Sequence, residues 1–174
     1  MQFPLLTTER FILRSLALED APEILRIRSD DRVNKYLDRP KATSIEDALA
    51  FIRKIQAGTG SFYWAISLKD NNTLMGSICL WNIVIEKKSG EIGYELHPDY
   101  QGKGIMQEAI TAVIKYGFET AGLNVITALL SPDNEKSIRL LERNDFVKDT
   151  SFEYISEEEL DNQVAYILKK IPRP

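Results

Sequence analysis

The residues that carry metal and disulfide chemistry are scarce in this chain. Its 174 residues include one cysteine, Cys79, and one histidine, His97. A single cysteine cannot form an internal disulfide, and one cysteine with one histidine falls short of a dedicated zinc ligand set. Cys79 lies in the apolar stretch LMGSICLW, with no activating base beside it in sequence. We therefore expect a buried structural thiol and no bound metal.

Long apolar runs and a basic charge balance are also missing. No run approaches the roughly 20 apolar residues that cross a bilayer, and the opening MQFPLLTTER lacks the features of a secretory signal. The net charge of −4 argues against a general nucleic-acid binder. These absences predict a cytoplasmic protein without membrane or direct nucleic-acid contacts. Without repeats or linkers, the chain is expected to form a single domain, residues 1–174.

Apolar periodicity predicts an alternation of strands and helices. Period-two patterns indicate strands at 10–16, 62–68, 74–85, 91–97, 125–131, 152–156 and 164–170. Helical patterns cover 20–29, 43–58, 104–121 and 135–144, and 29–37 fits a short helix or a turn. The expected helix caps are Asp20, the pair Ser44 with Asp47 or the pair Thr43 with Glu46, and either Asp133 or Asn134. Antiparallel hairpins combined with strand–helix–strand units indicate an α/β (α+β) mixed sheet covered by helices.

The stretch ELHPDYQGKGIMQEAI joins a strand to a helix through Gly102 and Gly104. Such a junction can bind anions, because the first N–H groups of a helix lack internal partners and glycine lets a ligand approach the backbone. A dinucleotide fingerprint is excluded, since Gln107 stands where the third glycine would be. A P-loop is excluded as well, because a glycine follows Lys103 and His97 precedes the turn.

Two motifs together resemble a known family. QGKGIM (101–106) resembles the Q/R-x-x-G-x-G/A pyrophosphate loop of the GNAT acetyltransferases, and NEKSIRLLERNDF (134–146) is similar to their second signature, N-x-x-S-x-x-x-x-x-x-x-G-F. The opening LTTERFILRSLALEDAPEILRI and the segment TSIEDALAFI resemble the RimJ/RimL branch, which acetylates N-terminal amines of ribosomal proteins. The resemblance implies acetyl-CoA as cosubstrate. It also implies a mostly antiparallel sheet of about seven strands, with splayed middle strands and about four flanking helices.

The resemblance also implies where acetyl-CoA would bind. Strands 91–97 and 125–131 would form the cleft, with backbone groups of Leu96 and His97 on the pantetheine arm and the acetyl carbonyl. The pyrophosphate would lie on the loop, and the following helix would add side-chain contacts. The implied cofactor-binding residues are Leu96, His97, Gln101, Gly102, Lys103, Gly104, Ile105, Met106, Asn134 and Ser137.

Acyl transfer to an amine needs an uncharged amine, proximity and stabilisation of the developing oxyanion. Strand alternation places Glu91 and Glu95 on one face, so both are candidate bases, acting directly or through a water. Tyr94 points to the opposite face and is expected in the core. His97, next to Pro98, is expected to pack at the surface rather than to act in catalysis.

The sequence departs from the family pattern at three positions. Met106 replaces a small loop residue but leaves its backbone N–H available. Asp145 replaces the glycine before Phe146, and aspartate tolerates the left-handed conformation that this turn needs. Leu141 stands where many members have a tyrosine that protonates the leaving thiolate.

The resulting hypothesis is an acetyl-CoA-dependent N-acetyltransferase that acts on a primary amine, with a protein N-terminus as the leading acceptor. One alternative keeps the reaction but changes the acceptor to a polyamine, amino acid or antibiotic. Another is a non-catalytic CoA-binding module, which Leu141 alone supports. The oligomeric state stays open, with a homodimer among the options.

Overall fold

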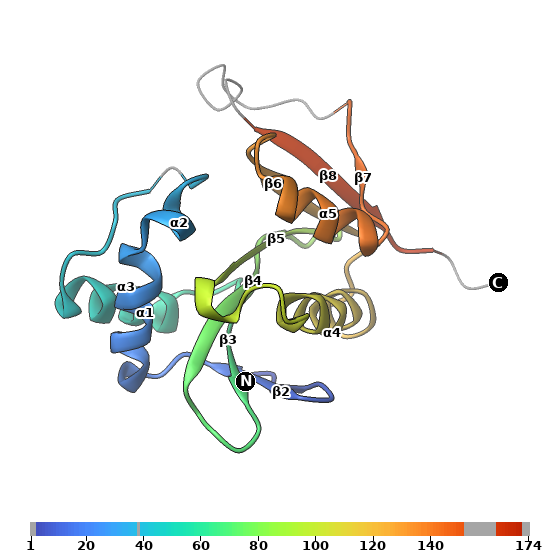
Figure 1. The fold of residues 1–174 in the computed structure, drawn as a ribbon. Helices are drawn as coiled ribbons and strands as arrows, with labels where there is room; N and C mark the ends of the chain where they lie inside the picture. The colour runs from blue at the N-terminus through green and yellow to red at the C-terminus, as the bar shows by residue number, and fades with distance from the viewer. Residues whose placement is uncertain (1–2, 38, 152–162, 172–174) are drawn as a thin grey trace.

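The computed structural model describes residues 3–37, 39–151 and 163–171. These residues contain one eight-stranded sheet in the order β1-β2-β3-β4-β5-β6-β8-β7 (Figure 1). Its strands are β1 (Leu6–Thr7), β2 (Phe11–Ser15), β3 (Phe62–Leu68), β4 (Leu74–Val84), β5 (Ser89–Leu96), β6 (Val125–Leu130), β7 (Val147–Lys148) and β8 (Val164–Lys169). The α-helices are α1 (Ala21–Ser29), α2 (Asp31–Asn34), α3 (Ile45–Ala57), α4 (Ile105–Glu119) and α5 (Glu135–Arg143), and η1 (Leu18–Asp20) and η2 (Pro98–Tyr100) are 3₁₀ helices.

The predicted mixed, mostly antiparallel sheet is confirmed. Every neighbouring pair of strands runs antiparallel except β5 with β6, which is parallel. The short strands β1 and β7 add to those predicted, because strands of two residues are too short to show a periodic pattern. The strand predicted at 152–156 lies outside the described residues.

Helices cover both faces of the sheet, as consecutive residues of β3 show. Trp64 and Ile66 belong to a buried cluster with α4, whereas Ala65 between them packs with α1 and α3. Successive side chains of a strand point to opposite faces. Helices α1 and α3 therefore cover one face and α4 the other, and Figure 1 shows the two groups well apart.

Local capping signals are mostly confirmed. Ser44 and Asp47 form the capping box of α3, and Asn134 rather than Asp133 caps α5. Asp20 is the N-cap residue of α1, as predicted, but its carboxylate makes no capping hydrogen bond to this helix. That carboxylate instead pairs with Arg14 and accepts the N–H of Ala17, because a buried charge is most stable with a charged partner.

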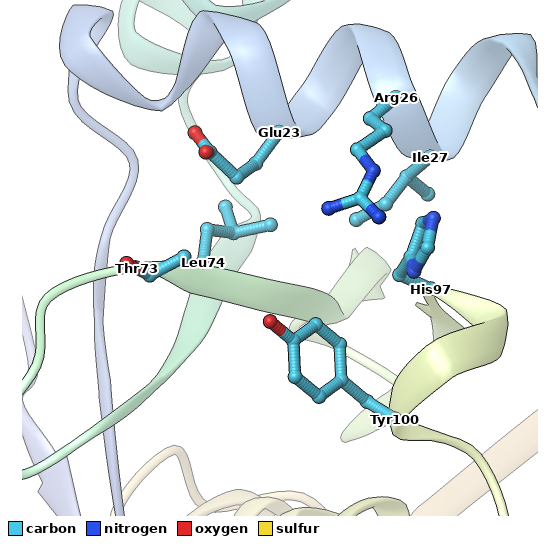
Figure 2. Close-up of a pocket in the computed structure, with 7 residues that line it drawn as sticks. All are labelled: Glu23, Arg26, Ile27, Thr73, Leu74, His97 and Tyr100. Atoms are coloured by element: carbon cyan, nitrogen blue, oxygen red, sulfur yellow. The ribbon is translucent and has the colours of Figure 1, made fainter.

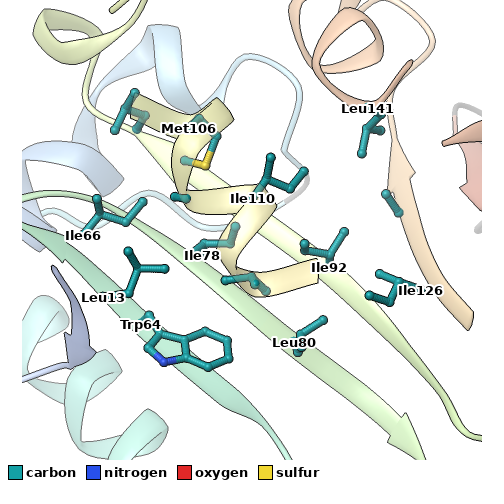
Figure 3. Close-up of a cluster of buried hydrophobic side chains, with 14 of the residues drawn as sticks. Leu13, Trp64, Ile66, Ile78, Leu80, Ile92, Met106, Ile110, Ile126 and Leu141 are labelled. Carbon is teal, nitrogen blue, oxygen red and sulfur yellow. The ribbon is translucent and has the colours of Figure 1, made fainter. Parts of the chain in front are cut away.

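The apolar core lies between the sheet and α4. Figure 3 shows Met106 and Ile110 of α4 among strand residues such as Ile78 and Leu80. Within the described residues, no helix is both long and apolar enough to cross a membrane.

Candidate active site

Strands β5 and β6 separate along their length. They pair only at Ser89–Glu91 with Val125–Thr127, yet β5 runs on to Leu96 and β6 to Leu130. Beyond Glu91 the two strands therefore diverge and leave backbone groups on their facing edges without a strand partner. The predicted splay of the middle strands is confirmed.

Backbone direction decides which residues of β5 face this opening. The N–H of His97 donates to the carbonyl of Met75 at 3.0 Å, and its own carbonyl accepts the N–H of Tyr100 at 2.9 Å. Both backbone groups of His97 are thus engaged, contrary to the role expected for them. Because backbone groups alternate in direction along a strand, those of Leu96 and Tyr94 point away from β4 and toward the opening. The backbone groups of Tyr94, rather than those of His97, therefore face the opening.

The glycine turn that follows β5 has the backbone geometry predicted for it. Gly102 and Gly104 have φ angles of 73° and 74°, and Gly104 is the N-cap of α4. A Cβ added to Gly102 would meet no atom within 4 Å, so this side of the turn is open. Among the described residues, the N–H groups of Gly102, Lys103 and Gly104 have no hydrogen-bond partner. Together with the first turn of α4, they can bind an anion.

Distant residues hold this turn in place. Arg10 Nη1 donates to the carbonyl of Lys103 at 3.1 Å, and Arg10 Nε donates to Glu108 Oε2 at 2.8 Å. Thr8 Oγ1 donates to Glu108 Oε1 at 2.6 Å. The Lys103 ammonium donates to the carbonyl of Asp99 at 2.8 Å. The turn is thus anchored from both sides, and its backbone, more than the lysine, offers free donors.

The first turn of α5 forms the opposite wall. Asn134 Oδ1 accepts the N–H of Ser137 at 3.3 Å, which caps the helix. The hydroxyls of Ser137 and Tyr94 lie 2.6 Å apart, so β5 and α5 are joined across the opening. Burial raises the pKa of Tyr94 to about 12, so its hydroxyl stays protonated near neutral pH. Lys136 Nζ and Gln101 Oε1, at 3.5 Å, join the same helix to the glycine turn.

Two of the residues that depart from the family pattern lie in the core. Met106 and Leu141 are both buried (Figure 3). Met106 therefore keeps its bulk away from the open side of the turn. Leu141 presents no hydroxyl, and Asp145 adopts the left-handed conformation expected there, with φ 64°.

Glu91 lies where β5 begins to leave β6. Its carboxylate accepts a 3.1 Å hydrogen bond from Asn82 Nδ2. Burial raises the pKa of Glu91, and the Asn82 hydrogen bond opposes that rise. A carboxylate with a raised pKa is a stronger base, as proton abstraction from an ammonium requires. No charged partner within the described residues neutralises Glu91.

Glu95 has a different environment, although it shares the face of Glu91. It is 8% exposed and lies in an ion pair with Arg39, with Nη2 and Oε2 2.6 Å apart. Arg28 Nη1 lies 3.9 Å from the other carboxylate oxygen, and Ser77 Oγ donates to that oxygen at 3.4 Å. Glu95 is thus paired with arginine, whereas Glu91 has no charged partner among the described residues, so the two glutamates are not equivalent.

His97 and Cys79 are structural in this arrangement. His97 is 5% exposed, so the expected surface position is wrong. Its Nδ1 accepts the N–H of Asp99 at 3.3 Å at the start of η2, and burial followed by the charge of Arg26 lowers the pKa of His97. Burial raises the pKa of Cys79 to about 12. An un-ionised thiol is a poor nucleophile.

Two hollows near α1 lie away from this opening. A cavity of about 10 Å³ next to α1 has room for at most one water, and Figure 2 shows its lining of Glu23, Arg26, Ile27, Thr73, Leu74, His97 and Tyr100. An open depression of about 420 Å³ is lined by residues that precede β4 or lie near α1, none of them on β5, β6 or α5. Among the described residues, no group of three or more His, Cys, Asp or Glu could hold a metal ion.

Comparison with known proteins identifies the family to which this site and fold belong. The family described as the acetyltransferase (GNAT) domain matches residues 10–147. The chain belongs to this family. As a GNAT acetyltransferase it uses acetyl-CoA as acyl donor. The open turn, the diverging strands and the N-terminus of α5 are chemically suited to that molecule, because they combine free N–H donors for phosphate with unpaired strand edges for an amide-bearing arm.

Relatives of this GNAT chain include proteins with and without a stated acceptor. An uncharacterised N-acetyltransferase of Bacillus subtilis, YoaA, is 35% identical over 84% of this chain and 85% of its own length. The ribosomal protein uS5-alanine N-acetyltransferase of Escherichia coli is 26% identical over 83% of this chain and 78% of its own. A GNAT acetyltransferase structure from Bacillus anthracis has a TM-score of 0.81 at 26% identity, covering 95% of this chain and 98% of that one.

The sequence did not point to three groups of residues in this GNAT site. Tyr94 contacts Ser137, Arg10 and Glu108 hold the glycine turn, and the two guanidiniums converge on Glu95. All these contacts join residues far apart in the chain. For the guanidiniums near Glu95, one local signal was available: Arg28 is a charged residue in the amphipathic helix α1.

Proposed function

We propose that this GNAT enzyme acetylates a primary amine by direct attack of the amine on the thioester of acetyl-CoA, and that the acceptor is the N-terminal α-amine of a protein. The whole chain, residues 1–174, would act as one domain. The observation that carries this proposal is the opening between β5 and β6, which has the donor-rich glycine turn at one end and Glu91 at the other. The similarity to a ribosomal-protein acetyltransferase supports the choice of acceptor.

Each wall of the opening has a role in binding acetyl-CoA. N–H groups of Gly102 to Met106 would hold the pyrophosphate, and the Leu96 and Tyr94 backbone would bind the pantetheine arm. Gln101 would act indirectly, since its side chain donates to the Leu96 carbonyl at 3.1 Å. Asn134 and Ser137 would border the arm from α5.

Of the two glutamates we assign the base to Glu91. Its carboxylate has no charged partner among the described residues and its pKa is raised, whereas Glu95 is held by Arg39. The base, directly or through a water, would take the proton of the attacking ammonium. An α-amine has an unperturbed pKa of about 7.7–8.0 against about 10.4 for lysine, so it loses that proton more readily.

An acetylation screen tests the proposal. N-terminal peptides and small amines are incubated with acetyl-CoA, thiol release is followed, and mass spectrometry locates the acetyl group. We expect transfer to the α-amine of at least one peptide, and no transfer to lysine in a peptide with a blocked N-terminus. Transfer only to small amines would contradict the assigned acceptor. Absence of transfer to every amine would contradict the reaction itself.

A further inference from the structure

The face of β5 that carries Glu91 also carries an unbalanced cluster of charges. Arg28, at the end of α1, and Arg39, in the segment before α3, both approach the carboxylate of Glu95. Among the described residues, two guanidiniums thus face one carboxylate, which leaves one positive charge in excess in this cluster. The charged side chains are largely but not fully buried, with 16% of Arg28 and 19% of Arg39 exposed.

The guanidinium donors of this cluster are incompletely used. Arg39 Nε donates to Asn34 Oδ1, but its buried Nη2, although close to Glu95, forms no hydrogen bond of normal geometry within the described residues. Arg28 lies over the ring of Phe51, 4.0 Å from the centroid, and its Nη1 lies 3.9 Å from Glu95 Oε1. A planar guanidinium fixed by an aromatic ring retains donors for an incoming acceptor group.

The position of the cluster connects it with the reaction. Glu91, Gly93 and Glu95 share one face of β5, since Ile92 and Leu96 lie in the core on the other face. Residues two apart on a strand are about 7 Å apart. A group bound beside Glu95 therefore lies about 7 Å, or two residue lengths, from a substrate atom over Gly93, on the side where an amine would meet Glu91. Gly93 adds no side chain there, and Cys79 Sγ and Trp81 Nε1, at 3.2 Å and 3.8 Å from the position of an added Cβ, border the path.

We propose that Arg28 and Arg39 form a binding site for a carboxylate of the amine acceptor, so that the enzyme prefers amines that carry a carboxylate roughly 7 Å from the reacting nitrogen. This inference rests on the proposed acetyl transfer and narrows its acceptor. A carboxylate matches a guanidinium in two parallel hydrogen bonds and balances the excess charge. Glu95 holds the arginines in position. The preferred class excludes polyamines, which would meet like charge here.

Matched acceptor pairs test this site. Each pair differs only in the carboxylate: peptides with Asp or Asn at position two, and a free amino acid of matching length, 6-aminohexanoate, or its amide. With acetyl-CoA saturating, we expect the acidic member to have a KM at least about tenfold lower, the change that one ion pair can give. A preference confined to peptides identifies a protein acceptor, and one confined to the free amino acid identifies a small molecule.

Variants separate recognition from a purely structural role. In Arg28→Gln the ratio of kcat/KM between the acidic and amide members should fall to about one. Arg28→Lys should give an intermediate ratio, because it keeps the positive charge but loses the planar guanidinium that forms two parallel hydrogen bonds. Arg53→Gln, on the exposed side of α3, is the matched control and should keep the wild-type ratio.

The outcomes are distinguishable. Equal KM values for acidic and amide acceptors in the wild type would overturn the carboxylate site while leaving acetyl transfer intact. A proportional loss for both members in Arg28→Gln would also overturn it, because that is the result of a structural ion pair. Failure to acetylate any member would instead refute the proposed function.

Discussion

Replacement of Gly102 by alanine separates the folding role of the glycine turn from its role in binding. Gly102 has φ 73°, in the left-handed region that costs an L-residue roughly 1–2 kcal/mol. An added Cβ meets no atom within 4 Å, so this conformational strain is the whole expected loss of folding free energy. For a chain of this length, that loss lowers Tm by about 2–8 °C.

Gly122, which follows α4, is a matched control. It has φ 72°, and an added Cβ there also meets nothing within 4 Å. Gly122→Ala should therefore lower Tm by a similar amount. The two variants differ in what fills the open space: at Gly102 it is the proposed pyrophosphate, whereas Gly122 lies between α4 and β6, away from the turn.

Isothermal titration with CoA distinguishes the two roles. We expect the Kd of Gly102→Ala to rise at least about tenfold, since one or more charge-assisted hydrogen bonds are lost. Gly122→Ala should bind as the wild type does. Equal Kd values for both variants, with both Tm values lowered, would show that the turn is structural and that our assignment of the pyrophosphate site is wrong.

Three further predictions concern single side chains. Glu91→Gln should lower kcat/KM by about 10²- to 10⁴-fold. Because burial raises the pKa of Glu91, ionisation of this carboxyl group lowers the stability of the fold as pH rises through that pKa. Glu91→Gln should therefore have a Tm equal to or above that of the wild type at pH 7, and the difference should vanish at low pH. A Tm of Glu91→Gln below the wild-type value at pH 7 would contradict this reasoning. Tyr94→Phe loses the 2.6 Å hydrogen bond to Ser137, so its free energy of unfolding, measured with urea, should fall by about 1 kcal/mol. Because the pKa of Tyr94 is about 12, ionisation of this residue should cause no change in the wild-type pH–rate profile below about pH 10. A Tyr94-dependent change below that pH would refute the assignment. Cys79, with a pKa of about 12, should react with a thiol reagent at pH 8 far more slowly in the folded than in the urea-unfolded protein, whereas equal rates would show that the thiol is accessible and ionised.

Local chemistry made much of this protein predictable from its sequence. The capping box of Ser44 with Asp47 and the left-handed glycines of the turn depend on hydrogen bonds and torsion angles within a few residues. The two signatures and the alternation of β5 likewise placed the turn, the start of α5 and the shared face of Glu91 and Glu95. Such features survive in sequence because each is satisfied by near neighbours.

Tertiary structure alone decided how these parts work together. The sequence leaves Glu91 and Glu95 as equal candidates, and the fold separates them by bringing Arg39 and Arg28 onto Glu95. His97 looked like a surface residue beside a proline, yet η2 buries it, and its backbone bonds leave Tyr94 to face the opening. Burial and ion pairing depend on residues that folding brings together from distant parts of the chain. For that reason, the glycine turn was readable in one stretch of sequence, whereas the different environments of Glu91 and Glu95 were not.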